Sequence, residues 1–293
     1  MARQKKLRTI NHRVVLNRSA GGDFVITFML LILGLLIAVP MYLQIINAFK
    51  PLNELFIYPP RFYVTKPTWD NFKDLFTLMT STWVPFTRYI FNTVFISIVG
   101  TLGTIMLSAV AAYALAKMNF PGRKAFFQTV IYALMIPSAV GGIVTFIVIS
   151  RLGLMDTQWA IIIPAWGASQ NVFLMKQFME ANITDAVLES ARLDGASELR
   201  IFWKIAMPMV KPAWLTIIVF SFNGLWKTGE NIYIQSEQLK TLPCAVSQLL
   251  SAGIVRTGAS AASSFILMLV PIVVFIITQS KIIETMGSSG MKD

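Results

Sequence analysis

This sequence of 293 residues is short of charged residues and has almost no side chains that form disulfides or bind metals. Charged residues make up 13% of the chain, whereas soluble domains contain about 25%. The single cysteine, Cys244, excludes an intrachain disulfide, and the single histidine, His12, leaves no Cys/His set for structural zinc. We therefore expect neither an ordinary soluble domain nor a metal site.

Two further absences concern the source of energy. The pattern G-x-x-x-x-G-K-[ST] does not occur, so we expect no ATP hydrolysis by this chain. The five long apolar runs given below contain no Asp, Glu, Lys, Arg or His, although ion-coupled carriers usually place such groups in the membrane. A secondary transporter and a membrane enzyme are thus the less favoured alternatives, because the enzyme would also need an acid–base pair or a metal set. We expect no catalytic residue and a separate motor.

The chain does contain long runs of apolar residues. Apolar residues make up 55% of it, and its mean hydropathy is +0.64. A helix needs about 20 residues to cross the roughly 30 Å hydrocarbon core of a bilayer. Five uncharged runs predict such spans: Phe24–Ile46, Tyr89–Ala116, Ala125–Ser150, Thr157–Met175 and Thr257–Ser280. A sixth, Ile205–Trp226, is interrupted by Lys211, so either the span starts there or that lysine snorkels to the interface.

Basic residues predict the orientation of these spans. The leader carries six Lys or Arg residues and no acid before Asp23, which places it in the cytoplasm. The first run lacks a small-residue cleavage site and is expected to be an anchor, not a signal peptide. The prediction is an all-α membrane protein of the bacterial cytoplasmic (inner) membrane with six transmembrane helices and both termini cytoplasmic. Its parts are a basic N-terminus at 1–23, a six-helix permease domain at 24–283 and a tail at 284–293.

The net charge of +11 has two readings. It fits the positive-inside rule and contact with anionic lipids of the bilayer. Nucleic-acid binding is disfavoured, because the bases do not gather on one surface with stacking aromatic residues.

Outside the membrane, the segment Asn47–Arg88 holds five prolines and predicts a turn-rich loop with a short helix near Asp70–Leu78. Gly100 and Gly103 favour close approach of a neighbouring helix.

The loop 176–211, between the fourth and fifth predicted helices, contains two short helices. Thr184 can cap the first, and Val187, Leu188 and Ala191 share one of its faces by their i, i+3/i+4 spacing. Asp194-Gly195 predicts a turn, because glycine takes the left-handed conformation that ends many helices. By composition alone this elbow either lies on lipid headgroups or fits a groove of a partner protein.

The motif within this loop resembles a known family. Glu189-Ser190-Ala191-Arg192-Leu193-Asp194-Gly195-Ala196, followed after eight residues by Ile205-Ala206-Met207-Pro208, is similar to the EAA loop of ABC importer permeases, E-A-A-x-x-D-G-A-x(8)-I-x-L-P. Ser190 and Met207 are the two departures. The segments Ala111–Ala116, Phe120–Arg123, Leu152–Leu154, Lys176–Phe178 and Thr241–Pro243 are similar to the sugar-importing branch, specifically the smaller maltose-type permease.

The resemblance implies how such a chain works. It implies a cytoplasmic coupling helix that docks on an ATPase, a second permease subunit, two ATPase subunits and an external solute-binding protein. It implies no cofactor on this chain, with ATP and Mg on the partner ATPase. The residues assigned to ATPase coupling are Val187, Leu188, Glu189, Ala191, Asp194, Gly195 and Ala196.

The substrate path is predicted from polar or aromatic side chains in the apolar spans. The candidates are Asn92, Gln128, Trp166, Gln170, Asn171, Asn223 and Trp226, each of which can instead bond a neighbouring helix. The stretch after the fifth span, Asn223 to Asn231, departs from the Trp-Asn-Glu/Asp pattern of the family. The outer-side bases Arg151, Lys227, Lys240 and Arg256 favour an acidic sugar, as in permeases for alginate-like oligosaccharides. A permease for another solute, such as an amino acid or a peptide, shares the EAA loop and stays as the alternative.

Overall fold

The structure is a computed structural model that describes residues 20–80, 83–229, 232–250 and 256–289. Over these ranges the chain is all helical. The elements are α1 (Ala20–Phe49), α2 (Leu52–Leu55), α3 (Asp70–Thr80), α4 (Phe86–Lys117), α5 (Arg123–Met135), α6 (Ser138–Arg151), α7 (Trp159–Trp166), α8 (Ser169–Asn182), α9 (Asp185–Leu193), α10 (Glu198–Ile201), α11 (Met207–Met209), α12 (Lys211–Trp226), α13 (Leu242–Leu250) and α14 (Thr257–Ser289), with a π-helical turn η1 (Phe202–Ala206) and a 3-10 turn η2 (Glu237–Leu239).

Three helices in the described ranges are by themselves long and apolar enough to cross a membrane: Gly21–Phe49 of α1, Phe86–Lys117 of α4 and Thr257–Ile282 of α14. Two bent helix pairs, α5 with α6 and Glu198–Met209 with α12, also pass by length and composition if each counts as one span. The protein is thus an all-helical membrane protein with three to five spans by this measure. The short helix predicted near Asp70–Leu78 is confirmed as α3.

Two predicted spans are not continuous helices. The run Ala125–Ser150 bends by 114° between α5 and α6 at Pro137, because the residue before a proline is pushed out of the helical region and Ile136 is extended at ψ 125°. The run Thr157–Met175 is divided into α7 and α8, since Ala168 has ψ 102° and interrupts the helix. Apolar length alone did not indicate either break.

The run that contains Lys211 is also divided. The chain bends by 78° between Met209 and Lys211, and α12 begins at that lysine with Pro212 in its first turn. Proline is favoured there, because its missing N–H needs no partner in a first helical turn. The structure therefore agrees with a span that starts near Lys211, and not with a lysine that snorkels from within the span.

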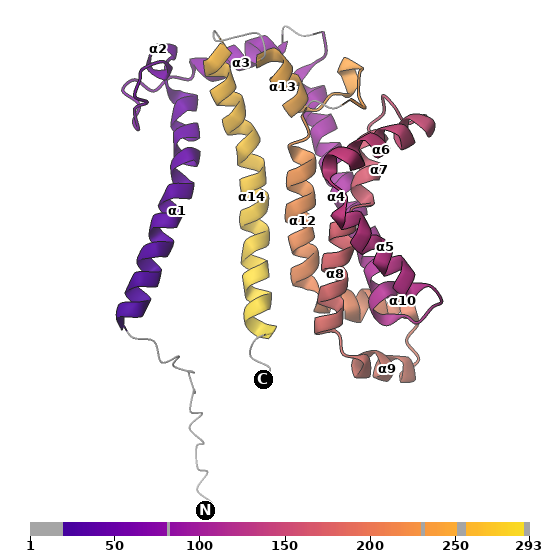
Figure 1. The fold of residues 1–293 in the computed structure, drawn as a ribbon. Helices are drawn as coiled ribbons and strands as arrows, with labels where there is room; N and C mark the ends of the chain where they lie inside the picture. The colour runs from indigo at the N-terminus through magenta and orange to yellow at the C-terminus, as the bar shows by residue number, and fades with distance from the viewer. Residues whose placement is uncertain (1–19, 81–82, 230–231, 251–255, 290–293) are drawn as a thin grey trace, which may run out of the picture.

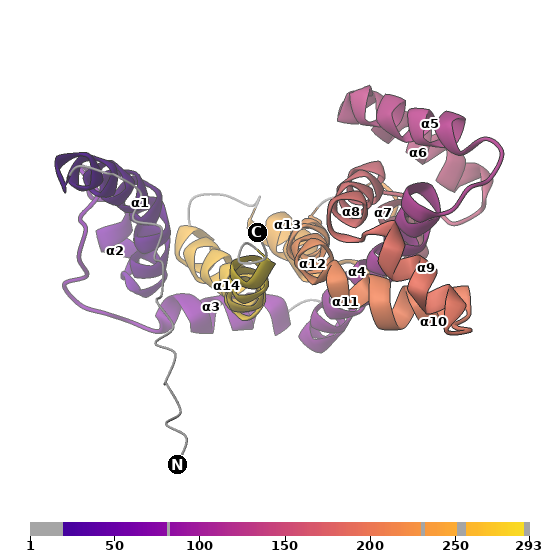
Figure 2. The ribbon, with the colours of Figure 1, turned by 90° about the horizontal axis from the view of Figure 1, so that it is seen from below.

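The arrangement is built around α4, which packs against α12, α8 and α7 (Figure 1). Viewed from below, α1 and α14 lie to one side of α12 and α4, and α5 and α6 form the opposite edge (Figure 2). Two glycines of α4 allow close packing: a Cβ on Gly103 would lie 2.0 Å from Nε1 of Trp166, and one on Gly100 would lie 2.4 Å from Cδ1 of Leu225. Both predicted close approaches are confirmed.

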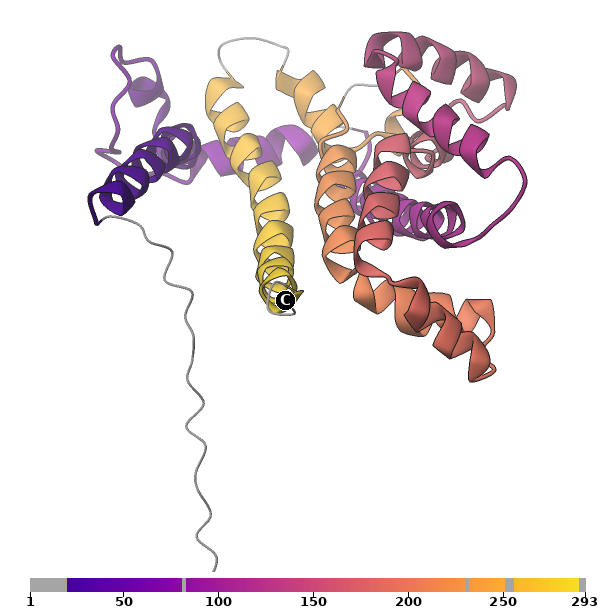
Figure 3. The same ribbon diagram turned by 60° about the horizontal axis from the view of Figure 1, so that its bottom comes forward.

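The two ends of the molecule differ. At one end lie α2, α3, α13, the end of α1 and the start of α14 (Figure 1). The start of α1, the end of α14 and the short helices α9 and α10 lie at the other end, where α9 extends beyond the long helices (Figure 1) and both short helices project to one side of the bundle (Figure 3). A core of buried apolar residues joins α9 and α10 to α4, α8 and α12, including Tyr113, Met179, Leu188, Ile201 and Ile217.

Candidate coupling elbow and translocation groove

The predicted elbow consists of α9, a turn and α10. Helix α9 starts after Thr184 as predicted, although no hydrogen bond from the Thr184 side chain caps it. The turn follows the predicted geometry: Gly195 has φ +78°, which glycine adopts without the clash of a Cβ. Its N–H donates to the carbonyl of Arg192 at 3.0 Å, and the N–H of Ala196 donates to the carbonyl of Ala191 at 3.0 Å. These two bonds close the helix end and reverse the chain.

Two residues of the predicted docking face of α9 are buried within the chain, which corrects that prediction. Leu188 is 1% exposed and Ala191 is 8% exposed, because both pack inward against Ile183, Ile201 and Phe202. They attach α9 to the membrane-spanning helices and are not available to a partner. The exposed apolar side chains of the elbow are Val187 (38%), Leu193 (90%) and Leu199 (73%). Of the other predicted coupling residues, Glu189, Asp194 and Gly195 are exposed and Ala196 is half-buried.

Two polar contacts connect the elbow to α4. The ammonium of Lys117 lies 2.9 Å from Oδ1 of Asp185, and this hydrogen bond holds the pKa of the Asp185 carboxyl below its ordinary value. The hydroxyl of Tyr113 donates to Oε2 of Glu198 at 3.0 Å, while Nε of Arg192 donates to Oε1 of the same carboxylate at 2.7 Å. One carboxylate thus joins α4, α9 and α10. These contacts connect α9 to the helix at the centre of the bundle.

A cavity of about 570 Å³ lies between α1, α12 and α14. Its polar side chains are Gln44, Asn223, Lys227 and Ser264, and the rest of its lining is mainly apolar and includes Pro271. Gln44 and Ser264 were not predicted from the sequence, because the candidates included no residue of the first or the last predicted span. Both stand in predicted spans, so a full inventory of polar residues in the apolar runs would have found them.

The seven predicted path residues occupy different environments. Asn223 lines the cavity, and its amide also donates to the carbonyl of Val219 at 2.8 Å. Gln128 and Gln170 are exposed on α5 and α8. Asn171 and Trp226 are buried, and they donate to Oγ of Ser221 at 3.2 Å and to the carbonyl of Leu267 at 3.0 Å. The half-buried Trp166 donates to the carbonyl of Val99 at 3.3 Å, and Asn92 is fully buried.

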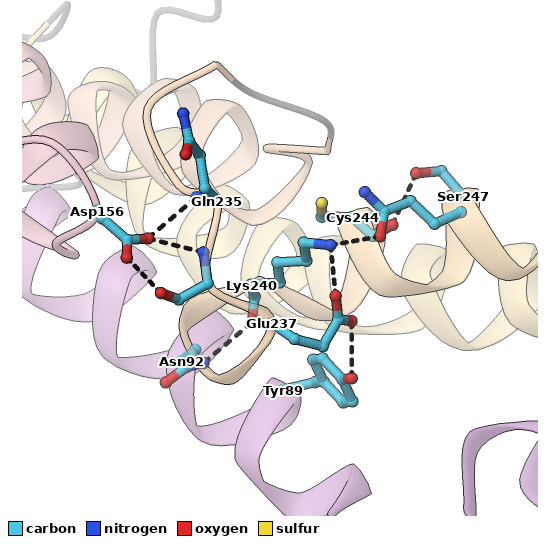
Figure 4. A network of polar contacts seen from close by, with 10 residues as sticks. Tyr89, Asn92, Asp156, Gln235, Glu237, Lys240, Cys244 and Ser247 are labelled. Atoms are coloured by element: carbon cyan, nitrogen blue, oxygen red, sulfur yellow. Dashed lines mark hydrogen bonds and ion pairs between the residues drawn. The ribbon is translucent and has the colours of Figure 1, made fainter. Parts of the chain in front are cut away.

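The buried amide of Asn92 belongs to a polar network that holds the loop 232–241 (Figure 4). Its nitrogen donates to the carbonyls of Gln238 at 2.8 Å and Lys240 at 3.0 Å, and its oxygen accepts from Gln158 at 2.7 Å. The hydroxyl of Tyr89 donates to Glu237 at 2.9 Å. Since these atoms are engaged within the chain, Asn92 positions the loop beside the start of α4.

Asp156 fastens the same loop from its other side (Figure 4). Its Oδ1 accepts from the backbone N–H of Gln235 at 3.0 Å and of Ser236 at 2.8 Å, and the hydroxyl of Ser236 donates to Oδ2. These hydrogen bonds, the Ser236 hydroxyl first, hold the pKa of Asp156 below its ordinary value. Lys240 contacts Glu237 and Gln248, so this base is paired within the loop.

Comparison with known proteins identifies the class of this chain. Residues 104–284 match the family described as binding-protein-dependent transport system inner membrane component. Protein LplC of Bacillus subtilis is 32% identical over 72% of this chain and 69% of its own length. The sn-glycerol-3-phosphate transport system permease protein UgpE of Yersinia enterocolitica is 30% identical over 70% of this chain and 73% of its own length. The polygalacturonan/rhamnogalacturonan transport system permease protein YtcP of Bacillus subtilis is 35% identical over 48% of this chain and 52% of its own length.

The fold agrees with that match. A chain of a bacterial ABC transporter involved in the import of the acidic polysaccharide alginate superposes with a TM-score of 0.75 at 20% identity, over 90% of this chain and 98% of that one. The match to the family covers more than half of the sequence, including the elbow and the cavity lining of α12 and α14. The chain therefore belongs to the binding-protein-dependent transport system inner membrane components, the non-catalytic permease subunits of ABC importers.

Proposed function

We propose that this permease subunit imports saccharides, and that its saccharides are anionic. The single observation that carries the charge preference is the cavity between α1, α12 and α14, in which the exposed Lys227 stands beside the polar Gln44, Asn223 and Ser264. An ammonium group next to amide and hydroxyl groups can bind a carboxylate and the hydroxyls of a sugar at once. The apolar remainder of the lining can lie against the faces of sugar rings.

The similar proteins support an anionic substrate. UgpE is named for sn-glycerol-3-phosphate, YtcP for polygalacturonan and rhamnogalacturonan, and the superposed transporter for the acidic polysaccharide alginate. Each of these compounds carries phosphate or carboxylate groups. Lys227 follows α12 directly. In the orientation proposed below, this end of α12 faces outward, where a sugar delivered from outside enters first.

The topology that fits this function has six spans. The three long helices supply three, the two bent pairs supply one each, and the broken pair α7–α8 supplies the last. The start of α1, the end of α14 and the elbow lie at one end of the molecule (Figure 1). We place that end in the cytoplasm, so that both termini are cytoplasmic and the loop 232–241 faces outward.

The assembly we propose contains a second permease subunit, two ATPase subunits that carry ATP and Mg, and an external solute-binding protein. The ATPase contacts the elbow through the exposed Glu189, Leu193 and Asp194, with Gly195 as the turn. A rigid handle is what such a partner requires, because a ligand biases a conformational change only by different contacts in the two states. The ion pair of Lys117 with Asp185 and the hydrogen bond of Tyr113 to Glu198 support such a role, because they hold the elbow against α4.

Uptake competition tests the substrate. The complete importer, reconstituted with its binding protein in vesicles, is given a labelled oligouronate with an excess of either unlabelled oligouronate or a neutral oligosaccharide of equal length. We expect competition by the uronate alone, and at least about a tenfold loss of uronate uptake in Lys227→Gln, because one charge-assisted hydrogen bond is worth roughly 1.5–3 kcal/mol.

The matched control is Lys66→Gln, which removes an exposed base from another outer segment. Equal competition by the neutral sugar contradicts the anionic preference. Equal loss in both lysine variants contradicts the role of Lys227. Uptake of neither sugar, together with uptake of an amino acid or a peptide, contradicts the saccharide assignment as a whole.

A further inference from the structure

A second cavity, of about 770 Å³, lies where the end of α4, the start of α5 and the middle of α8 meet. It is at the end of the molecule that carries the elbow (Figure 1), and it is separate from the groove between α1, α12 and α14. Its lining consists of Leu115, Asn119, Phe120, Gly122, Arg123, Lys124, Ala125, Phe127 and Lys176. The side chains that define its chemistry are three bases and two phenylalanines.

The charges of this cavity are unbalanced. Glu180 lies 2.7 Å from the ammonium of Lys176 and 3.9 Å from Nη2 of Arg123, so one carboxylate serves two cations. Lys124 adds a third cation on an exposed side chain. The nearby Lys117 is paired with Asp185. Three bases against one acid leave a net positive charge in the cavity, which suits an anionic group.

The cations are held in place by the protein itself. Nε and Nη2 of Arg123 donate to the carbonyls of Leu115 at 2.7 Å and Ala116 at 2.9 Å, which fixes the guanidinium at the end of α4. The ammonium of Lys176 lies 3.9 Å from the ring centroid of Phe127, and this side chain is only 9% exposed. This cation–π contact and the ion pair with Glu180 hold the ammonium in position. Binding an anion here requires little ordering of side chains.

An apolar surface continues from the cavity along α5. Phe120 lies at the rim and is 40% exposed, and further along the helix Phe126 (56%), Tyr132 (59%) and Met135 (74%) are exposed. No residue of α5 is buried by the described part of the chain. A charged pocket beside a helix whose apolar side chains are uncovered matches a molecule with an anionic head and long hydrocarbon tails.

We propose that this cavity binds the headgroup of an anionic phospholipid, with the acyl chains along the exposed apolar side chains of α5. Basic pockets between membrane helices on the cytoplasmic side bind such headgroups, and the cytoplasmic leaflet carries anionic lipids. The assignment to that leaflet rests on the topology proposed above. The lipid links α5 to α4 and α8 at the level of the elbow, where the described contacts of α5 within the chain are few.

Bromine quenching tests the proposal directly. Phe120→Trp places an indole at the cavity rim, and its fluorescence is measured as the difference from the parent protein in the assembled importer. Nanodiscs of phosphatidylcholine receive acyl-brominated phosphatidylglycerol in one arm and acyl-brominated phosphatidylcholine in the other. We expect half-maximal quenching at about a fivefold lower mole fraction of the phosphatidylglycerol, since each base near a membrane surface contributes roughly that factor.

The variant that tests the cation is Lys124→Gln, with Lys204→Gln as a matched control, because Lys204 is an exposed base of the elbow end outside the cavity. Each is measured in the Phe120→Trp background. The preference for phosphatidylglycerol should fall about fivefold in Lys124→Gln and stay unchanged in the control. Added inorganic phosphate at millimolar concentration should not relieve the quenching.

Four results overturn the proposal. Equal quenching by both lipids shows contact without headgroup recognition. An equal fall in both lysine variants shows a general surface potential. Absence of quenching by either lipid shows that another subunit covers the cavity. Relief by inorganic phosphate assigns the site to a soluble anion and also overturns it.

Discussion

Tyr113 of α4 donates a hydrogen bond of 3.0 Å to Glu198 of α10, which stands 85 residues further along the chain. The same carboxylate accepts a hydrogen bond of 2.7 Å from Arg192 of α9. Three helices therefore meet at one side chain. Because α4 is the helix against which α7, α8 and α12 pack, this contact connects the elbow to the whole bundle.

We expect Tyr113→Phe to weaken the transmission of force and to spare the fold. The loss of one hydrogen bond costs about 0.5–1.5 kcal/mol, which is small beside the packing of the Tyr113 ring against Phe202. The number of solutes imported per ATP hydrolysed should fall in the reconstituted importer. Tyr42→Phe is the control, because it removes a 2.8 Å hydrogen bond to the carbonyl of Phe62 at the other end. A ratio that falls equally in both variants would show a general effect of losing a hydroxyl.

Leu188→Ala and Leu193→Ala should have opposite consequences. Leu188 is buried in the core that attaches α9, so its truncation should lower the stability of the subunit by about 2–5 kcal/mol. Leu193 is 90% exposed, and its truncation should change stability by no more than about 0.5 kcal/mol while weakening capture of the ATPase. Thermal unfolding of the detergent-solubilised subunit and ATPase pull-down measure the two effects. If the Leu188→Ala protein is stable but fails to capture the ATPase, Leu188 belongs to the surface that contacts the ATPase.

Substitutions of Gly195 separate backbone conformation from charge. Its φ of +78° costs a residue with a Cβ about 1–2 kcal/mol, and less for Asn and Asp, which tolerate this region. No atom lies within 4 Å of the position that a Cβ would take. We therefore expect Gly195→Asn to retain stimulated ATP hydrolysis and Gly195→Asp, of nearly the same shape, to abolish it by placing a further acid beside Asp194. If the two variants lose hydrolysis equally, charge is not the cause.

Protonation of Asp156 should release the outer loop. The pKa of this carboxyl is lower in the folded protein, so its contribution to stability is complete above the unfolded value, about 3.9, and is lost as the pH falls through the folded value. In hydrogen exchange, the amides of Gln235 and Ser236 should exchange several-fold faster in Asp156→Asn than in the parent at pH 6. This difference should shrink as the pH falls below about 4.

The control for that measurement is Asp70→Asn, in α3. Asp70 also has a lowered pKa, chiefly through the hydroxyl of Thr68, but it is not part of the network around the loop 232–241. Its substitution should leave the exchange of Gln235 and Ser236 unchanged at every pH. A difference between Asp156→Asn and the parent that persists to pH 2 would show that the charge of Asp156 does not hold the loop.

Much of the fold followed from local properties of the sequence. The runs Phe24–Ile46, Tyr89–Ala116 and Thr257–Ser280 lie within α1, α4 and α14, because uncharged length is a property of the segment itself. The two broken runs were missed, although Pro137 was visible. A proline in an apolar run can produce a modest kink or a complete break, and the helices packed around it decide which.

The sequence likewise predicted only part of the candidate site. Spacing placed Val187, Leu188 and Ala191 on one face of α9, but spacing does not say what that face meets, and the structure directs Leu188 and Ala191 into the core. The role of Asn92 was likewise invisible, because its partners lie about 150 residues away in the outer loop.

The sequence by itself determined the class of this protein: apolar length requires a membrane, the absence of ionisable groups from the five clear runs indicates an external motor, and the elbow motif with Gly195 predicts where that motor acts. These are local features that survive without knowledge of any contact. Only the tertiary structure decided which side chains of the elbow stay exposed and which polar groups line one groove. Gln44, Asn223 and Ser264 come from three helices far apart in the chain, and only long-range packing brings them together.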